Sequence, residues 1–219
     1  MDWHALHLSL LLGVLTVACL LPVALVAGRW LAVSRTRHRA LIEAALTLPL
    51  VLPPTVIGFY LLGALGPDSI AGRLWSSLTG GGTLVFSFEG ILLASVLVNL
   101  PFAVQPAQRG FEAVGDELRD AAATCGHSLL QTILRVELPL AWPGIVTGAV
   151  LTFAHTLGEF GVVLMIGGAI PGVTKVASIA LYDDVQALAY PQAHAFAATL
   201  LGLSFALLLV VTLLQRRRA

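Results

Sequence analysis

Five long apolar stretches, separated by shorter polar segments, make up most of the 219-residue chain. Each stretch is close to the roughly 20 residues that an α-helix needs to cross a bilayer, and is far longer than a membrane β-strand. Helices also satisfy their own backbone hydrogen bonds within lipid. The pattern predicts spanning helices over residues 6–27, 41–65, 86–104, 140–167 and 193–214.

Composition agrees with this pattern. The chain is 58% hydrophobic and 11% charged, whereas an ordinary soluble domain is about 25% charged. We therefore expect an all-α integral membrane protein: a polytopic bundle of about five transmembrane helices that forms a single domain over residues 1–219. The net charge of zero gives no indication of a nucleic-acid partner. Cys19 and Cys125 lie in different segments, and we expect both thiols to be unpaired.

Positive charge is distributed unevenly along the five-span pattern. Ten of the twelve Lys and Arg residues follow the first, third or fifth span, and only Arg73 and Lys175 lie in the other connections. Cytoplasmic segments of membrane proteins are enriched in Lys and Arg. The amino terminus is therefore predicted to lie outside and the carboxyl terminus inside. An even number of spans would not place these charges on one side.

The longest predicted cytoplasmic segment, residues 105–139, contains two short helical patterns. Good helix formers occupy residues 116–125, and Gly126 then provides a residue that readily takes a positive φ at a helix end. Ser128 and Gln131 have the spacing of a capping box, which predicts the start of a second short helix. The residues alone leave two interpretations open: a connector on the membrane surface, or a helix-turn-helix that another protein contacts.

The spacing within this segment resembles the EAA loop of ABC-transporter permeases: Glu-Ala-Ala, three residues, Gly, nine residues, Ile, one residue, Leu-Pro. The chain departs from it by Asp for Glu and Val for Ile. The matching positions are Asp120, Ala121, Ala122, Gly126, Val136, Leu138 and Pro139. In that family the loop docks into a groove on a separate cytoplasmic ATPase. The resemblance implies that these residues dock and couple the chain to such an ATPase.

Three further stretches resemble the molybdate-type permeases, close relatives of the sulfate permeases. They are LTLPLVLPPTVIGFYLL (46–62), LTFAHTLGEFGVVLMI (151–166) and IPGVTKVASIALYDDV (170–185). The resemblance implies the permease subunit of an ABC importer that carries molybdate across the cytoplasmic (inner) membrane of a prokaryote by alternating access, with sulfate or tungstate as alternatives. It also implies a homodimer that works in membrane lipid with two ATPase copies and an external substrate-binding protein.

The chain has no nucleotide-binding signature of its own. It contains no GxxxxGK[ST] run, and its only lysine is Lys175, in a predicted outer loop. We therefore expect no catalytic residue, metal site or bound cofactor in this chain, with ATP and Mg²⁺ used by the partner ATPase. The chain also contains neither GxSxG nor HExxH, which argues against an intramembrane enzyme.

The second predicted span is interrupted by Pro49, Pro53 and Pro54. Prolines within a span are tolerated where neighbouring groups or cavity water satisfy the freed carbonyls. Thr55 follows directly and can bond back to a carbonyl. Two interpretations remain open: a kinked helix that lines a translocation pathway, or a bent helix that only packs.

Polar residues also occur near the middle of the fourth predicted span. His155 and Glu159 are four residues apart and share a helical face, with Thr152 and Thr156 nearby. A charge at the bilayer centre costs about 2.5–3.5 kcal/mol on insertion scales, so these groups should face the bundle interior. They form either a structural pair or the border of an oxyanion route. The candidate pathway residues are Pro53, Pro54, Thr55, Thr152, His155, Thr156 and Glu159.

A secondary transporter driven by an ion gradient is an alternative from a different class, with His155 and Glu159 as a proton relay. The lack of an evident inverted repeat and the EAA-like spacing argue against it. Elsewhere, Gly144 and Gly148 form a small-xxx-small pair, which is compatible with either a dimer contact or internal packing. The outer segment 66–83 is expected to hold a short surface helix that is capped by Asp68 or Ser69 and ended by glycines.

Overall fold

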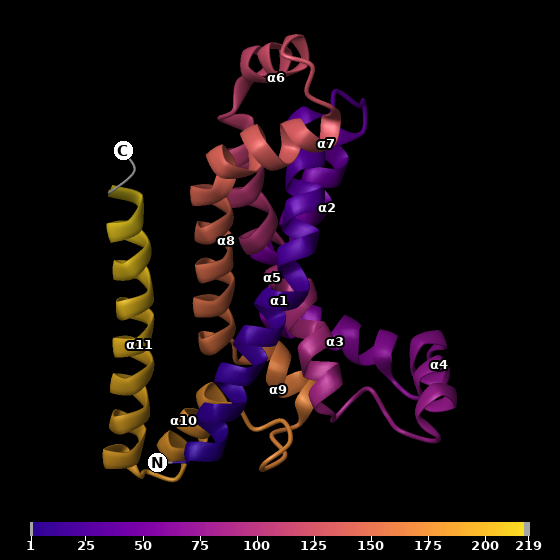
Figure 1. Ribbon diagram of the computed structural model, residues 1–219. Coiled ribbons are helices and arrows are strands. Elements are labelled where there is room, and N and C mark those ends of the chain that lie inside the picture. Colours follow the sequence, from indigo (N-terminus) through magenta and orange to yellow (C-terminus); the bar gives the residue numbers. More distant parts are fainter. Residues whose placement is uncertain (1, 217–219) are drawn as a thin grey trace.

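The computed structural model describes residues 2–216, although the side chains of Val210 and residues 214–216 lie outside that description. All regular structure in this range is helical (Figure 1). The first half comprises α1 (Trp3–Val33), α2 (Arg39–Val51), α3 (Pro54–Leu65), α4 (Ile70–Thr79) and α5 (Phe88–Glu112). The second half comprises α6 (Gly115–Thr124), α7 (Leu129–Thr132), the π-helix η1 (Ile133–Glu137), α8 (Leu138–Gly158), α9 (Gly161–Gly167), α10 (Ala177–Gln186) and α11 (Tyr190–Arg216).

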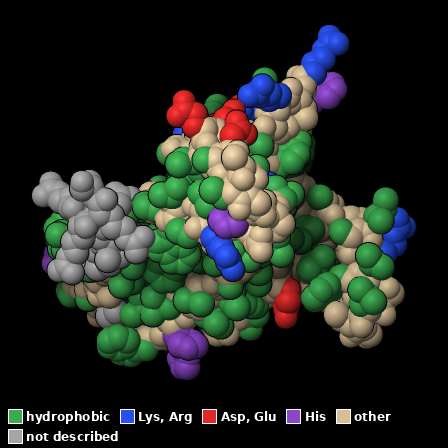
Figure 2. Space-filling model, turned by 45° about the horizontal axis from the view of Figure 1, so that its top comes forward, with side chains coloured by type: hydrophobic (Ala, Val, Ile, Leu, Met, Phe, Trp, Pro, Cys, Tyr) green, Lys and Arg blue, Asp and Glu red, His purple; other side chains and the backbone are tan. Residues whose placement is uncertain are grey.

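Four helical units are long and apolar enough to cross a membrane: α1, α5, α11 and the continuous 30-residue unit Leu129–Gly158. The pair α2 and α3 qualifies as a fifth span if it is taken together, with a bend of 109° between its halves. Figure 2 shows hydrophobic side chains over much of the visible face, with charged side chains in a few small groups. The predicted all-α membrane fold with about five spans is confirmed.

Two of the predicted spans differ from continuous helices. The second is broken at Leu52 and Pro53, because Leu52 precedes a proline and is extended, with ψ 139°. The fourth was predicted over residues 140–167, but its helix runs from Leu129 to Gly158, and residues 161–167 form the separate helix α9. Glu159 is extended at this break, with φ −69° and ψ 128°. Its carbonyl accepts a 2.6 Å hydrogen bond from the hydroxyl of Ser178.

The core of the bundle is formed by α1, α5 and α8, which pack closely on one another. Where α5 meets α8, a Cβ added to Gly148 would lie 2.7 Å from the carbonyl oxygen of Ala103, and one added to Gly144 would clash with the carbonyl of Pro106. The two backbones are therefore in contact at these glycines. The small-xxx-small pair serves internal packing.

The two ends of the bundle carry different elements (Figure 1). The elements α6 and α7 and the carboxyl end of α11 lie at one end, whereas the amino terminus, α4 and α10 lie at the other. This arrangement is what an odd number of crossings requires. The predicted inside face corresponds to the end with α6, and its orientation toward the cytoplasm remains a prediction. Arg217 and Arg218, which contribute to that prediction, lie outside the described residues.

Two local predictions are confirmed. Ser69 caps α4 by accepting a 2.9 Å hydrogen bond from the N–H of Gly72, and Gly80 ends the helix in the left-handed region with φ 71°. Both Cys19 and Cys125 are free and exposed.

The close contact between α5 and α8 predicts a specific sensitivity to volume. Gly144→Val places a branched side chain against the backbone of α5, and overpacking of this kind costs about 1–3 kcal/mol. We expect a lower midpoint of thermal unfolding in detergent. Gly202→Val is the matched control, because a Cβ at Gly202 meets no atom within 4 Å. Equal midpoints for the two variants would contradict the packing described here.

Candidate functional site

The segment between α5 and α8 forms an elbow at the α6 end of the bundle (Figure 1). The helix α6 ends at Thr124, and Gly126 adopts φ 79°. Ser128 then caps α7 through a reciprocal capping box: its N–H donates to Gln131 Oε1 at 2.8 Å, and its Oγ accepts from the Gln131 N–H at 3.4 Å. The predicted first helix, glycine turn and capping box are all present.

The second predicted short helix is not a separate element. After the single turn of α7, the chain continues through the π-helix η1 directly into α8. The N–H of Leu138 bonds to the carbonyl of Ile133, five residues back. This wider turn comes directly before Pro139. A proline has no N–H to donate, and in a regular α-helix its ring would clash with the carbonyl four residues earlier, so the wider turn relieves that clash. The second half of the elbow, α7 and η1, therefore forms one continuous helical unit with α8.

The residues that match the EAA-like spacing lie on two sides of the elbow. Asp120, Ala121, Gly126 and Pro139 are exposed, Ala122 is buried, and Val136 and Leu138 are half-buried. Exposed apolar side chains flank them, namely Leu118, Leu129, Leu130 and Leu134. The elbow therefore has a partly apolar outer surface, whereas Ala122, Val136 and Leu138 are packed on its inner side.

A buried ion-pair cluster holds the elbow to the bundle, and the sequence analysis did not identify it. Glu137 is fully buried. Its carboxylate accepts from Arg29 of α1 at 2.6 and 3.0 Å and from Arg119 of α6 at 3.3 Å. The signal that was available is a single acidic residue between apolar neighbours in the run ILRVELPL.

A cavity of about 520 Å³ lies where the two interrupted spans meet. Its lining comes from both sides of the α2/α3 break, from α5 and from the α8/α9 break. Close packing holds the breaks together: a Cβ on Gly161 would lie 2.9 Å from Pro54 Cβ, and one on Gly58 would lie 2.7 Å from Met165 Cβ. Discontinuous helices that meet around a cavity are a recurrent way to build substrate sites in transporters.

The polar lining of this cavity includes His155 and Glu159. The Nδ1 atom of His155 lies 3.0 Å from Oδ1 of Asn99, and its ring stacks on Phe102 with centroids 4.2 Å apart. The Glu159 side chain is 6% exposed, and neither carboxylate oxygen has a hydrogen-bond partner among the described residues. Asn99 and Phe102 are thus site residues that the sequence analysis missed.

The predicted pathway residues separate into two groups. Pro54, Thr55, His155 and Glu159 line the cavity, and their role in a translocation pathway stays a prediction. Pro53 is exposed and is not part of the lining.

Thr152 and Thr156 are buried away from the cavity. Thr156 Oγ1 donates to the carbonyl of Thr152 at 2.8 Å, beside a 3.0 Å hydrogen bond from Thr16 to Ser95. Neither threonine lines this cavity, because α1 and α5 cover that side of α8, and their place in a translocation pathway stays a prediction.

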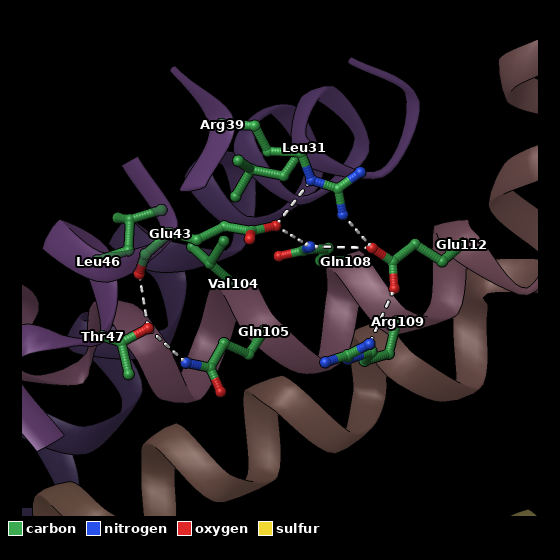
Figure 3. Close-up of a pocket in the computed structure, with 10 residues that line it drawn as sticks. All are labelled: Leu31, Arg39, Glu43, Leu46, Thr47, Val104, Gln105, Gln108, Arg109 and Glu112. Atoms are coloured by element: carbon green, nitrogen blue, oxygen red, sulfur yellow. Dashed lines mark hydrogen bonds and ion pairs between the residues drawn. The ribbon is translucent and has the colours of Figure 1, made fainter. Parts of the chain in front are cut away.

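A polar network joins α2 to α5 near the α6 end of the bundle (Figure 3). Arg39 bonds to Glu43 at 2.9 Å and to Glu112 at 2.6 Å, and Gln108 donates to the same two carboxylates at 2.7 and 3.0 Å. These side chains, with Arg109, line a pocket of about 300 Å³. Two guanidinium groups balance two carboxylates here, so the network ties the helices without offering excess positive charge.

The cavity geometry predicts a difference in access between two threonines. In a background with Cys19→Ser and Cys125→Ser, Thr55→Cys should react with a hydrophilic thiol reagent, because Thr55 is exposed and lines the cavity. Thr152→Cys should react only after denaturation, because Thr152 is fully buried. Labelling extent on a denaturing gel measures both. Similar rates for the two native variants would contradict the assignment.

Comparisons with known proteins agree with this architecture. The chain matches the family described as "Binding-protein-dependent transport system inner membrane component" over residues 21–219. It is 46% identical to the molybdenum transport system permease protein ModB of Azotobacter vinelandii, covering 100% of this chain and 96% of that protein. Identity to the ModB protein of Escherichia coli K12 is 36%, over 98% of this chain and 92% of the relative.

A more distant relative is the sulfate transport system permease protein CysT of Salmonella typhimurium, 33% identical over 82% of this chain and 64% of that protein. Among solved structures, a bacterial ABC transporter that imports the acidic polysaccharide alginate has a TM-score of 0.78 at 17% identity, over 98% of this chain and 78% of the other. The chain thus belongs to the family of inner-membrane permease components of binding-protein-dependent ABC transport systems.

Proposed function

We propose that this chain is the permease subunit of an ATP-driven importer that moves molybdate across the inner membrane, coupled to a separate ATPase through residues 120–139. The observation that carries this function is the elbow formed by α6, Gly126 and α7, which extends from one end of the bundle with Asp120 and Ala121 exposed. Its EAA-like spacing occurs in a chain that is 46% identical to a molybdenum permease over its whole length.

Molybdate is favoured over sulfate by the extent of the similarity. The ModB relatives are 46% and 36% identical and are covered over 96% and 92% of their lengths. The CysT relative is 33% identical and is covered over 64% of its length. Tungstate is a tetrahedral oxyanion like molybdate and sulfate. Measuring how strongly each of the three anions inhibits uptake of the other two would separate these alternatives.

The chain is expected to act as a homodimer. Several residues that line the cavity, among them Leu50, Pro54 and Thr55, are exposed in the single chain. A second copy would supply the missing wall of an anion route. Two ATPase copies would then bind the two elbows, and an external binding protein would deliver the anion. A similar fold is known in a complex with an alginate-bound periplasmic protein.

The cavity chemistry fits a weak and transient oxyanion site. Thr55 and His155 offer hydrogen-bond donors, whereas Glu159 repels a dianion and would limit its residence. Binding in a transporter must be favourable enough for entry and weak enough for release. We expect the chain to bind no cofactor, and the partner ATPase to bind ATP and Mg²⁺.

Gly126→Val tests the coupling role of the elbow. A β-branched residue at φ 79° is strained, so the turn between α6 and α7 should open and dock poorly. We expect at least a fivefold loss of ATPase that co-purifies with the chain, at normal membrane levels. Gly202→Val, in an open position on α11, should retain the ATPase. Full retention by the Gly126 variant would refute the docking geometry.

His155→Ala and Glu159→Gln test the cavity. Both remove a polar group from its lining, so ATP-dependent molybdate uptake should fall severalfold in each while ATPase retention stays normal. His194→Ala and Glu89→Gln are matched controls at exposed positions. Wild-type uptake rates in both cavity variants would remove the cavity from the pathway.

The unpaired carboxylate of Glu159, in the same cavity as His155, also suits a proton relay in a gradient-driven transporter. The two functions differ in their energy source. Uptake that persists without the ATPase and collapses with a protonophore would establish the secondary transporter.

A further inference from the structure

Glu137 lies at the junction of the elbow and α8, and it is inaccessible to solvent. Arg29 contacts it with two nitrogens, Nε to Oε2 at 2.6 Å and Nη2 to Oε1 at 3.0 Å. Arg119 Nε reaches Oε1 at 3.3 Å. One carboxylate therefore joins α6 and η1 of the elbow to α1, whose Arg29 is 108 residues away in sequence.

Arg119 extends this joint to a fourth element. Its Nη2 donates to the carbonyl of Phe111, at the end of α5, at 2.7 Å, and its Nη1 pairs with Asp116 at 3.0 Å. The Arg119 side chain is 14% exposed, although it belongs to a helix whose surface is otherwise mostly open. The guanidinium fork thus points inward, to the bundle.

Other attachments of α6 are sparse. Ala122 is the one buried residue of this helix. Its packing contacts are mainly with α7 and η1, which belong to the elbow itself. A charged, buried and fork-shaped contact has a fixed geometry, whereas exposed ion pairs rearrange in water. Apart from the chain connections to α5 and α7, a displacement of α6 would therefore reach the bundle chiefly through Arg119 and Glu137.

We propose that Glu137 is a positioning residue that transmits movement of the elbow to α1 and α5, with Arg119 and Arg29 as its two arms. The proposal rests on the proposed function, since it assumes that an ATPase moves the elbow. Glu137 does not line the cavity; it fixes the angle between the elbow and the helices α1 and α5, of which α5 contributes to the cavity lining. Loss of the joint should leave docking intact and uncouple hydrolysis from transport.

The experiment uses the complete complex with its ATPase in proteoliposomes. It measures molybdate transported per ATP hydrolysed, together with the amount of ATPase retained. Glu137→Gln keeps the size of the side chain and removes its charge, and we expect the transport ratio to fall at least tenfold with retention within twofold of wild type. Glu117→Gln, an exposed position on α6, should keep the wild-type ratio.

A second variant guards against misfolding around a buried amide. Arg119→Gln leaves the pair of Arg29 and Glu137 in place but cuts the arm to α6, so it should uncouple as Glu137→Gln does. Arg37→Gln, which removes an exposed arginine from the same end of the bundle, is its control. Retained ATPase with an unchanged ratio in Arg119→Gln would overturn the proposal. A wild-type chain that retains no ATPase would instead refute the proposed function.

Discussion

The structure depends on one constraint: a backbone group in the membrane must find its hydrogen-bond partner within the protein. Most of the chain meets it with continuous helices, and the exceptions are concentrated in one place. The break before Pro53 and the break at Glu159 face each other across the packing of α3 on α9. At the second break, the N–H of Glu159 bonds to Thr156 and its carbonyl to Ser178. Because the two helix breaks lie next to each other, the residues around them line a single cavity.

At the α6 end of the bundle, charged side chains are paired with one another and connect helices. The Glu137 cluster links α1, α6 and η1, and the network around Arg39 links α2 to α5 (Figure 3). Leaving one partner of a buried pair without its counterpart costs about 3–5 kcal/mol, so such contacts fix geometry even where they add little net stability. Around the cavity, by contrast, Glu159 has no partner among the described residues. A glutamate therefore has two different roles: Glu137 holds helices together at the end of the bundle, whereas Glu159 lies at the cavity near its middle, unpaired within the part of the chain that the structure describes.

Local signals in the sequence predicted local structure well. Apolar length located α1, α5 and α11, and the turn at Gly126 and the cap at Ser128 follow from backbone preferences that neighbouring residues determine. The break at Glu159 could not be predicted in this way, because its neighbours are apolar or glycine and its stabilising hydroxyl is 19 residues away. The Arg29–Glu137 contact spans 108 residues. Helical periodicity placed Thr152 and Thr156 near His155, but only the packing of α1 and α5 decides which side of α8 is covered.

The helices α7 and η1 of the elbow continue directly into α8. This continuity has a mechanical consequence that two separate helices would not have. The 30-residue unit Leu129–Gly158 is about 45 Å long at the usual rise of 1.5 Å per residue. One end of it lies beside Gly126, and the other end is Glu159, at the cavity. A rotation of α7 and η1 is therefore also a rotation of this unit, and a small angle at one end becomes a displacement of several ångströms at the other. Since Glu137 lies near the elbow end and is held by α1, it can act as the pivot of that rotation.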